Sequence, residues 1–210
     1  MNKLGDLSCN EFLTELASAA PAPGGGGGAA MAGALAAALA SMVANLTIGK
    51  EKFADREPEV KELLEQAEAE RVRLLTLVDE DAAVFNSFMS CYKLPKTTDE
   101  EKAARTAAIR AAAKQAATVP LNIARSSFAV LKLADRLVVS GNPGVITDGA
   151  CSGLLARAAL RCAEYNVRIN LGLTKDEAWN AQAAAELKQL LADAEALEIR
   201  LLAVTDKALQ

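Results

Sequence analysis

The stretch from Leu16 to Gly49 constrains the fold more than any other, because it contains no Asp, Glu, Lys or Arg. It passes through Pro21-Ala22-Pro23 and five consecutive glycines, and it continues as an Ala-rich segment. A run of this length can suggest a membrane span. Ala and Gly gain little from lipid, however, and polar residues lie at its end. A central helix that other helices bury on all sides explains the stretch better.

The glycines from Gly24 to Gly28 lie directly before the segment that we expect to be helical, from about Ala29 to Lys50. Glycine backbone can approach a ligand closely, and the free N–H groups of a helix start favour anions or oxygen atoms. The glycines therefore predict a cradle for such a group. A tight turn, a linker or a packing device would produce the same pattern.

The remaining chain carries helical signals throughout, so we predict one all-α domain over residues 1–210. The sequence is 51% hydrophobic and only 4% aromatic, which favours closely packed helices over a sheet sandwich. Ser8, Thr98 and Thr174 each precede a glutamate by three residues, as capping boxes do. Pro120 should end or kink the helix that follows Thr98. We expect an up-and-down bundle of six or seven helices around the Ala/Gly-rich helix, and its small-residue faces favour a homodimer.

Charge and cysteine content exclude several classes of function. The net charge is −4 and no basic run is present, so a nucleic-acid partner is not expected. The chain has no histidine, and its four cysteines are far apart, which disfavours a zinc site or a His-based catalytic triad. The first residues do not resemble a signal peptide, so we expect a cytoplasmic protein with free thiols.

Without histidine, acid–base catalysis must use Asp, Glu, Lys, Tyr or Cys. Asp148 is the first candidate, since it lies between a turn and an otherwise uncharged helix start, although capping alone would place an Asp there. Asp81 lies beside the apolar stripe of the helix that ends near Cys91, where a carboxylate is costly unless paired or used. Its neighbour Asp79 is expected to be solvated.

Four further polar residues could bind a ligand or have only structural roles. Asn45 and Lys50 lie where the central helix should end, and lysine is ordinary at a helix C-terminus. Asn166 and Asn170 are spaced i, i+4 on one helical face. Their amides could hold the hydrogen-bonding edge of a heterocycle or satisfy loop backbone.

Several uncommon motifs occur in an order that resembles the cyclodeaminase/cyclohydrolase family, which includes the cyclodeaminase half of formiminotransferase-cyclodeaminase and free-standing methenyltetrahydrofolate cyclohydrolases. The resemblance covers nearly the whole chain. The motifs are Pro21-Ala22-Pro23-Gly24-Gly25-Gly26, Met31–Leu35, Met42–Lys50, Asp79–Phe85, Tyr92–Pro95, Gly141-Asn142-Pro143, Thr147–Ala150 and Asn166–Asn170. The chain has Gly27 and Thr147 where many relatives have serine, and Phe53 where tyrosine is common.

The resemblance implies a dimeric helical enzyme that acts on folate one-carbon units, with a tetrahydrofolate derivative as substrate and no metal or prosthetic group. Under it, Asp148 would be the base or stabilise charge, Asp81 would be a second acid–base group, and Lys93 and Lys50 would meet the glutamate tail or share in proton transfer. The tail could be polyglutamylated. Asn142, Asn166 and Asn170 would orient the pterin, with Asn45 nearby and a wall formed by Gly24, Gly25, Gly26 and Gly27.

Three functions stay open at this point. The first is hydrolysis of methenyltetrahydrofolate to formyltetrahydrofolate, which a free-standing chain favours. The second is cyclodeamination of formiminotetrahydrofolate, which would use the same pocket and release ammonia. The third is a non-catalytic helical protein that binds folate or only assembles.

Overall fold

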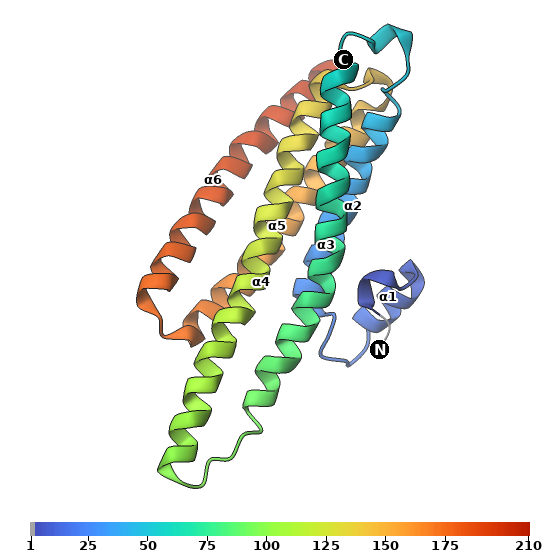
Figure 1. The fold of residues 1–210 in the computed structure, drawn as a ribbon. Helices are drawn as coiled ribbons and strands as arrows, with labels where there is room; N and C mark the ends of the chain where they lie inside the picture. The colour runs from blue at the N-terminus through green and yellow to red at the C-terminus, as the bar shows by residue number, and fades with distance from the viewer. Residues whose placement is uncertain (1–2) are drawn as a thin grey trace.

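The computed structural model describes residues 3–210, which form an up-and-down bundle of six α-helices without a strand (Figure 1). The predicted all-α fold is therefore confirmed. The helices are α1 (Cys9–Leu16), α2 (Gly24–Asn45), α3 (Glu57–Cys91), α4 (Asp99–Ser140), α5 (Ile146–Thr174) and α6 (Glu177–Ala208), with short 3-10 turns at Leu4–Asp6, Glu51–Phe53 and Pro143–Val145.

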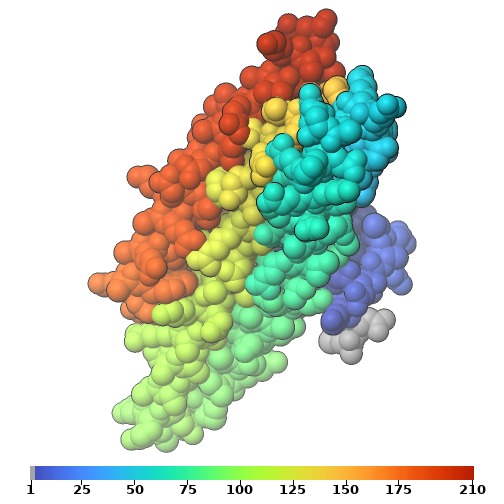
Figure 2. All heavy atoms as spheres, turned by 45° about the horizontal axis from the view of Figure 1, so that its top comes forward, coloured from blue at the N-terminus to red at the C-terminus, as the bar shows by residue number. Residues whose placement is uncertain are grey.

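The four central helices form two layers. α2 and α5 pack antiparallel to one another, and α3 and α4 cover one side of this pair. α6 packs on α4 and α5, while α1 lies beside α2 and α3 (Figure 1). The turn between α3 and α4 projects beyond the ends of the other helices, as the green segment in Figures 1 and 2 shows.

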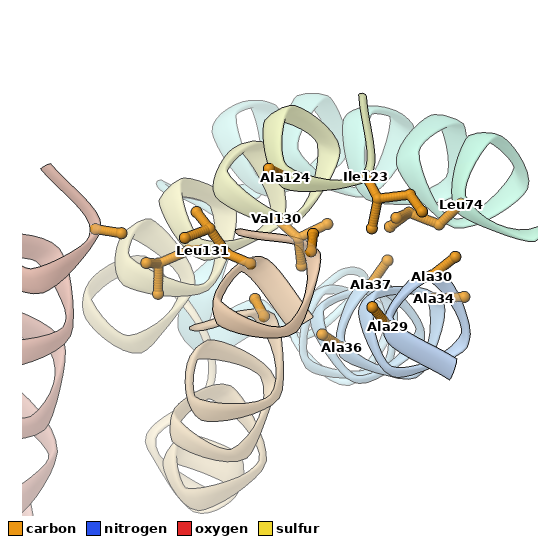
Figure 3. Packing of buried hydrophobic residues seen from close by; sticks show 14 of the residues in the cluster. Ala29, Ala30, Ala34, Ala36, Ala37, Leu74, Ile123, Ala124, Val130 and Leu131 are labelled. Atoms are coloured by element: carbon orange, nitrogen blue, oxygen red, sulfur yellow. The ribbon is translucent and has the colours of Figure 1, made fainter. Parts of the chain in front are cut away.

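α2 is the packing centre that the uncharged stretch predicts. Its alanines face Leu74 of α3 and Ile123 of α4, and the small side chains let these helices approach closely (Figure 3). α2 is long and apolar enough to cross a membrane, but 61% of its most apolar window is buried inside the protein. A buried core helix explains this composition, since one such helix is weak evidence for a membrane span.

The five glycines belong to the helix itself, and the predicted start at Ala29 is wrong. α2 begins at Gly24, which has a φ of +56°, and the Gly27 N–H already donates to the Pro23 carbonyl at 3.1 Å. Glycine is required inside these turns because a β-carbon on Gly27 would lie 2.8 Å from Pro23 Cβ. The helix also ends at Asn45 and not at Lys50, and Gly49 adopts a φ of +75° in the turn that follows.

Two of the three predicted capping boxes are present. Ser8 and Thr98 each accept a hydrogen bond from the backbone of the glutamate three residues later, and that glutamate accepts one in return. The third is wrong, because Asp176 is the cap of α6 and accepts from Trp179 N–H. The Thr174 hydroxyl instead donates to Asn180 Oδ1 at 2.5 Å.

α1 ends at Leu16, and α5 continues past the Asn166–Asn170 motif to Thr174. Asp148 lies in the first turn of α5, but Val145 holds the cap position without a side-chain hydrogen bond, so Asp148 does not cap this helix. α4 continues through Pro120 to Ser140, so this proline does not end the helix.

Candidate active site

A cavity of about 320 Å³ opens where the start of α2 meets α3, α4 and the last part of α5. The turn of residues 21–23, which contains the cis peptide bond Ala22-Pro23, forms one wall with Gly24, Gly25 and Gly26. α4 contributes Ala116 and Pro120. The apolar surface is ample for a heterocycle, and few polar groups point into it.

α3 presents one charged and three apolar side chains to this cavity. Asp81, Val84, Phe85 and Phe88 follow one another at helical spacing, so they lie on the same face of α3. The ring of Phe88 also packs edge-on against Tyr92, with 5.3 Å between ring centroids. The aromatic wall is a feature that the sequence analysis missed, although the spacing of Phe85 and Phe88 from Asp81 was visible.

Among residues 3–210, Asp81 is the one charged residue that lines the cavity. Its carboxylate lies against the backbone of Gly26, at the positive end of α2. Burial raises the pKa of Asp81 to about 6, because the charged form loses water, and a hydrogen bond from the Gly27 N–H opposes this shift. A carboxyl group with this pKa can exchange protons near neutral pH.

Asn166 and Asn170 line the opposite wall of the cavity. Asn166 Nδ2 donates to the Cys162 carbonyl at 3.0 Å, and Asn170 Nδ2 donates to the carbonyls of Ala116 and Asn166 at 2.9 and 2.8 Å. The side-chain nitrogen atoms of both residues therefore donate to backbone carbonyls of α4 and α5. Within residues 3–210 no donor reaches either Oδ1 atom, so both oxygens can still accept a hydrogen bond from a ligand.

Half of the sequence-predicted site residues line this cavity. They are Gly24, Gly25, Gly26, Asp81, Asn166 and Asn170. Gly27 is buried directly behind them. Lys93 is exposed in the α3–α4 turn, past Phe88 and Tyr92.

The other four predicted residues lie at the opposite end of α2, about 30 Å away by the rise of a 22-residue helix. Asn142 joins the α4–α5 turn to this end, because its N–H donates to Thr47 Oγ1 at 2.8 Å and its Nδ2 donates to the Leu46 carbonyl at 3.1 Å. Asn45 and Lys50 are exposed there, and Asp148 is half-buried in the first turn of α5. One protomer therefore does not bring Asp81 and Asp148 together.

Asp79 is half-buried, so it is only partly solvated. Its Oδ1 accepts from the Leu4 N–H at 2.6 Å, and so it fixes the N-terminal segment on α3. No group of three or more His, Cys, Asp and Glu side chains able to hold a metal ion occurs among residues 3–210.

Comparisons with known proteins agree with this architecture and with the resemblance in sequence. The chain is 45% identical to the methenyltetrahydrofolate cyclohydrolase of Methylorubrum extorquens, over 94% of this chain and 95% of that protein. It is 34% identical to the formimidoyltransferase-cyclodeaminase of Sus scrofa, of which it spans about a third, 34% of that protein's length. The crystal structure of formiminotetrahydrofolate cyclodeaminase from Thermotoga maritima matches with a TM-score of 0.88 and 30% identity, over 98% of each chain.

A family model described as formiminotransferase-cyclodeaminase matches residues 8–207, which include every helix from α1 to α5 and all of α6 except its last residue. The predicted resemblance is therefore confirmed. This chain belongs to the formiminotransferase-cyclodeaminase family.

Proposed function

We propose that this protein is an enzyme that hydrolyses methenyltetrahydrofolate to formyltetrahydrofolate. The observation that carries the proposal is the half-buried carboxyl group of Asp81, placed in a largely apolar cavity beside the start of α2. The similarity to a methenyltetrahydrofolate cyclohydrolase over nearly the full length of both chains supports the same reaction.

The substrate's bridging carbon belongs to a cationic amidinium group, and an ionised Asp81 would attract it. Asp81 takes a proton from a water molecule as the water oxygen bonds to that carbon, which gives a neutral tetrahedral carbinolamine. One C–N bond then breaks: Asp81 returns its proton to the departing ring nitrogen, the carbinolamine hydroxyl loses its proton to water, and the carbon becomes a formyl group. A carboxyl group whose pKa is about 6 can accept and return this proton near neutral pH.

The other walls of the cavity would hold the heterocycle. Phe85 and Phe88 offer flat apolar surface on α3, while the Oδ1 atoms of Asn166 and Asn170 can accept from the N–H groups of a pterin. The α3–α4 turn that carries Lys93 lies past the aromatic wall, so we assign Lys93 to the glutamate or polyglutamate tail. No prosthetic group enters this mechanism, and a cytoplasmic location stays a prediction.

Two substrates test the proposal in one assay. Purified protein is given methenyltetrahydrofolate, and the loss of its absorbance is compared with the spontaneous rate. In parallel, formiminotetrahydrofolate is supplied and released ammonia is measured. Faster loss of methenyl absorbance without ammonia is the expected result, and kcat/KM should rise with pH through about 6 as Asp81 ionises.

A second candidate function is cyclodeamination, which the match to the Thermotoga maritima cyclodeaminase structure favours. In this reaction one folate nitrogen attacks the formimino carbon, and ammonia leaves after it is protonated. Protonated Asp81 could supply that proton. Ammonia release would select this reaction over the first, and no change in either substrate would leave a binding or assembly protein.

A further inference from the structure

The helical hairpin that joins α3 to α4 has no core of its own. Phe88 is the last buried residue of α3, and the next buried residue along the chain is Ala113 of α4. The hairpin between them, residues 89–112, projects beyond the ends of the other helices (Figure 1). Because no packed core fixes this hairpin, contacts between its two helical halves must hold it in place.

Arg105 of α4 makes two such contacts with Tyr92 at the end of α3. Its guanidinium lies over the Tyr92 ring, 5.5 Å from the ring centroid, and its Nη2 donates to the Tyr92 carbonyl at 3.2 Å. The last carbonyls of a helix have no partner inside it and carry partial negative charge. The last turn of α3 contains no basic residue. Arg105 therefore supplies from α4 the donor and the positive charge that this turn lacks.

The side chain of Arg105 is held in place and does not extend freely into solvent. The residue is half-buried, and its Nε atom is enclosed without a hydrogen-bond partner within residues 3–210. An arginine that served only solubility would turn its guanidinium into water, since an enclosed donor without a partner costs free energy. The contacts with Tyr92 offset that cost.

Tyr92 connects Arg105 to the cavity. Its ring packs edge-on against Phe88, at an interplanar angle of 83°, and Phe88 lines the cavity. Arg105, Tyr92 and Phe88 therefore form one continuous stack, the Arg105 stack, which runs from the hairpin to the cavity wall.

We propose that Arg105 is a positioning residue that holds the Phe88 ring in the cavity wall through Tyr92, and that it thereby sets the affinity for the heterocycle of the substrate. This inference rests on the proposed function. A ring that is fixed before the substrate arrives loses less conformational entropy on binding. The Asp81 carboxylate lies against α2 and not against the Arg105 stack, so loss of Arg105 should weaken binding and preserve proton transfer.

Steady-state kinetics on methenyltetrahydrofolate test the positioning role. Arg105→Ala should raise KM about three- to tenfold, the scale of one aromatic contact, while kcat changes by less than about twofold. Arg110→Ala, at an exposed position of the same helix, is the matched control for the loss of one positive charge and should leave KM unchanged. A wild-type KM in Arg105→Ala, or an equal rise in Arg110→Ala, would overturn the inference.

Variants of Tyr92 separate the stack from the charge of Arg105. Tyr92→Leu removes the ring without changing the charge, and it should raise KM as much as Arg105→Ala does. Tyr92→Phe keeps the ring and should recover most of the affinity that Tyr92→Leu loses. The double variant of Arg105→Ala and Tyr92→Leu should bind no more weakly than either single variant, because both break the same stack. Multiplied increases in KM would overturn the inference.

Hydrogen exchange tests the Arg105 stack without relying on activity. In protein without substrate, the amides of residues 86–94 should exchange clearly faster in Arg105→Ala than in wild type, and Arg110→Ala should not change them. Exchange at the wild-type rate in Arg105→Ala would overturn the inference. If exchange responds as expected but wild-type protein leaves both folates unchanged, the proposed function fails while the Arg105 stack stands.

Discussion

A β-carbon on Gly26 would lie only 2.6 Å from the carboxyl carbon of Asp81. The first turn of α2 therefore packs directly against the carboxylate of Asp81 on α3, and no side chain fits between them. This relationship explains why a glycine occupies a helical position, where it is otherwise unfavourable by roughly 0.5–1 kcal/mol relative to alanine. The close packing also holds the Asp81 carboxylate at the N-terminus of α2.

Gly26→Ala should reduce activity by at least roughly tenfold, because the added methyl group must push Asp81 out of its position, and small misplacements of catalytic groups are costly. Steady-state kinetics on methenyltetrahydrofolate measure the effect. Gly28→Ala is the matched control in the same helix, because its β-carbon would meet nothing closer than Leu16 Cδ2 at 3.9 Å. Equal losses in the two variants would show that the helix start, and not Asp81, is responsible.

Asp81→Asn should stabilise the protein at pH 8 while it abolishes most of the activity. The pKa of Asp81 rises from 3.8 to about 6 on folding. The contribution of this group to the free energy of unfolding is therefore fully present below pH 3.8 and is lost as pH rises through 6. Ionised Asp81 then costs the folded state up to roughly 3 kcal/mol, at 1.36 kcal/mol per pKa unit.

Urea unfolding at pH 4 and pH 8 checks this prediction. The advantage of Asp81→Asn over wild type should be larger at pH 8 and should shrink toward pH 4. Asp193→Asn on α6, which is exposed, controls for the removal of one negative charge. A variant that is less stable than wild type at pH 8 would contradict the assigned direction.

The sequence predicted the central helix and the bundle well because both follow from periodicity and composition. The uncharged stretch had to be buried, and the Ser8 and Thr98 capping boxes are local interactions that need no tertiary contact. The glycine run was misplaced for a different reason. Glycines inside a helix are unfavourable on their own, and their tolerance depends on Asp81 and Pro23, which only the packed structure reveals.

The candidate site was predicted in part for a similar reason. Asp81, Asn166 and the glycines were each identified, and the structure brings them into one cavity. Asp148 and Asn142 were grouped with them, although the antiparallel course of α2 and α5 sets them at the far end. Residue types and spacing reveal candidate chemistry, but they do not show at which end of a long helix a side chain lies.

Asp79→Ala should release the N-terminal segment, because the part-buried Leu4 N–H would lose its acceptor. This segment leads through α1 into the turn of residues 21–23 that walls the cavity, so KM should rise more than kcat falls. We expect a loss of stability of about 1 kcal/mol. Hydrogen exchange of residues 4–16 measures the release. Asp79→Asn keeps an acceptor oxygen and should behave nearly as wild type; exchange as fast as in Asp79→Ala would show that the charge matters instead.

The side-chain amide of Asn170 takes the place of the backbone N–H that Pro120 lacks. In a regular helix the N–H of residue 120 would donate to the Ala116 carbonyl, but proline has no N–H. Asn170 Nδ2 donates to that carbonyl at 2.9 Å, from α5 across to α4, and this contact helps α4 to continue through Pro120. The amide is thus a structural as well as a ligand-facing group.

Asn170→Ala should therefore cost about 1 kcal/mol of unfolding free energy, the usual scale for a hydrogen bond lost at a part-buried carbonyl. In a Pro120→Ala background the same substitution should cost clearly less, because the alanine introduced there has a backbone N–H that can donate to the Ala116 carbonyl. Urea unfolding of the two single variants and the double variant forms a double-mutant cycle that isolates this coupling. Additive losses would mean that Asn170 stabilises α5 through the Asn166 carbonyl alone, and that α4 tolerates Pro120 without help.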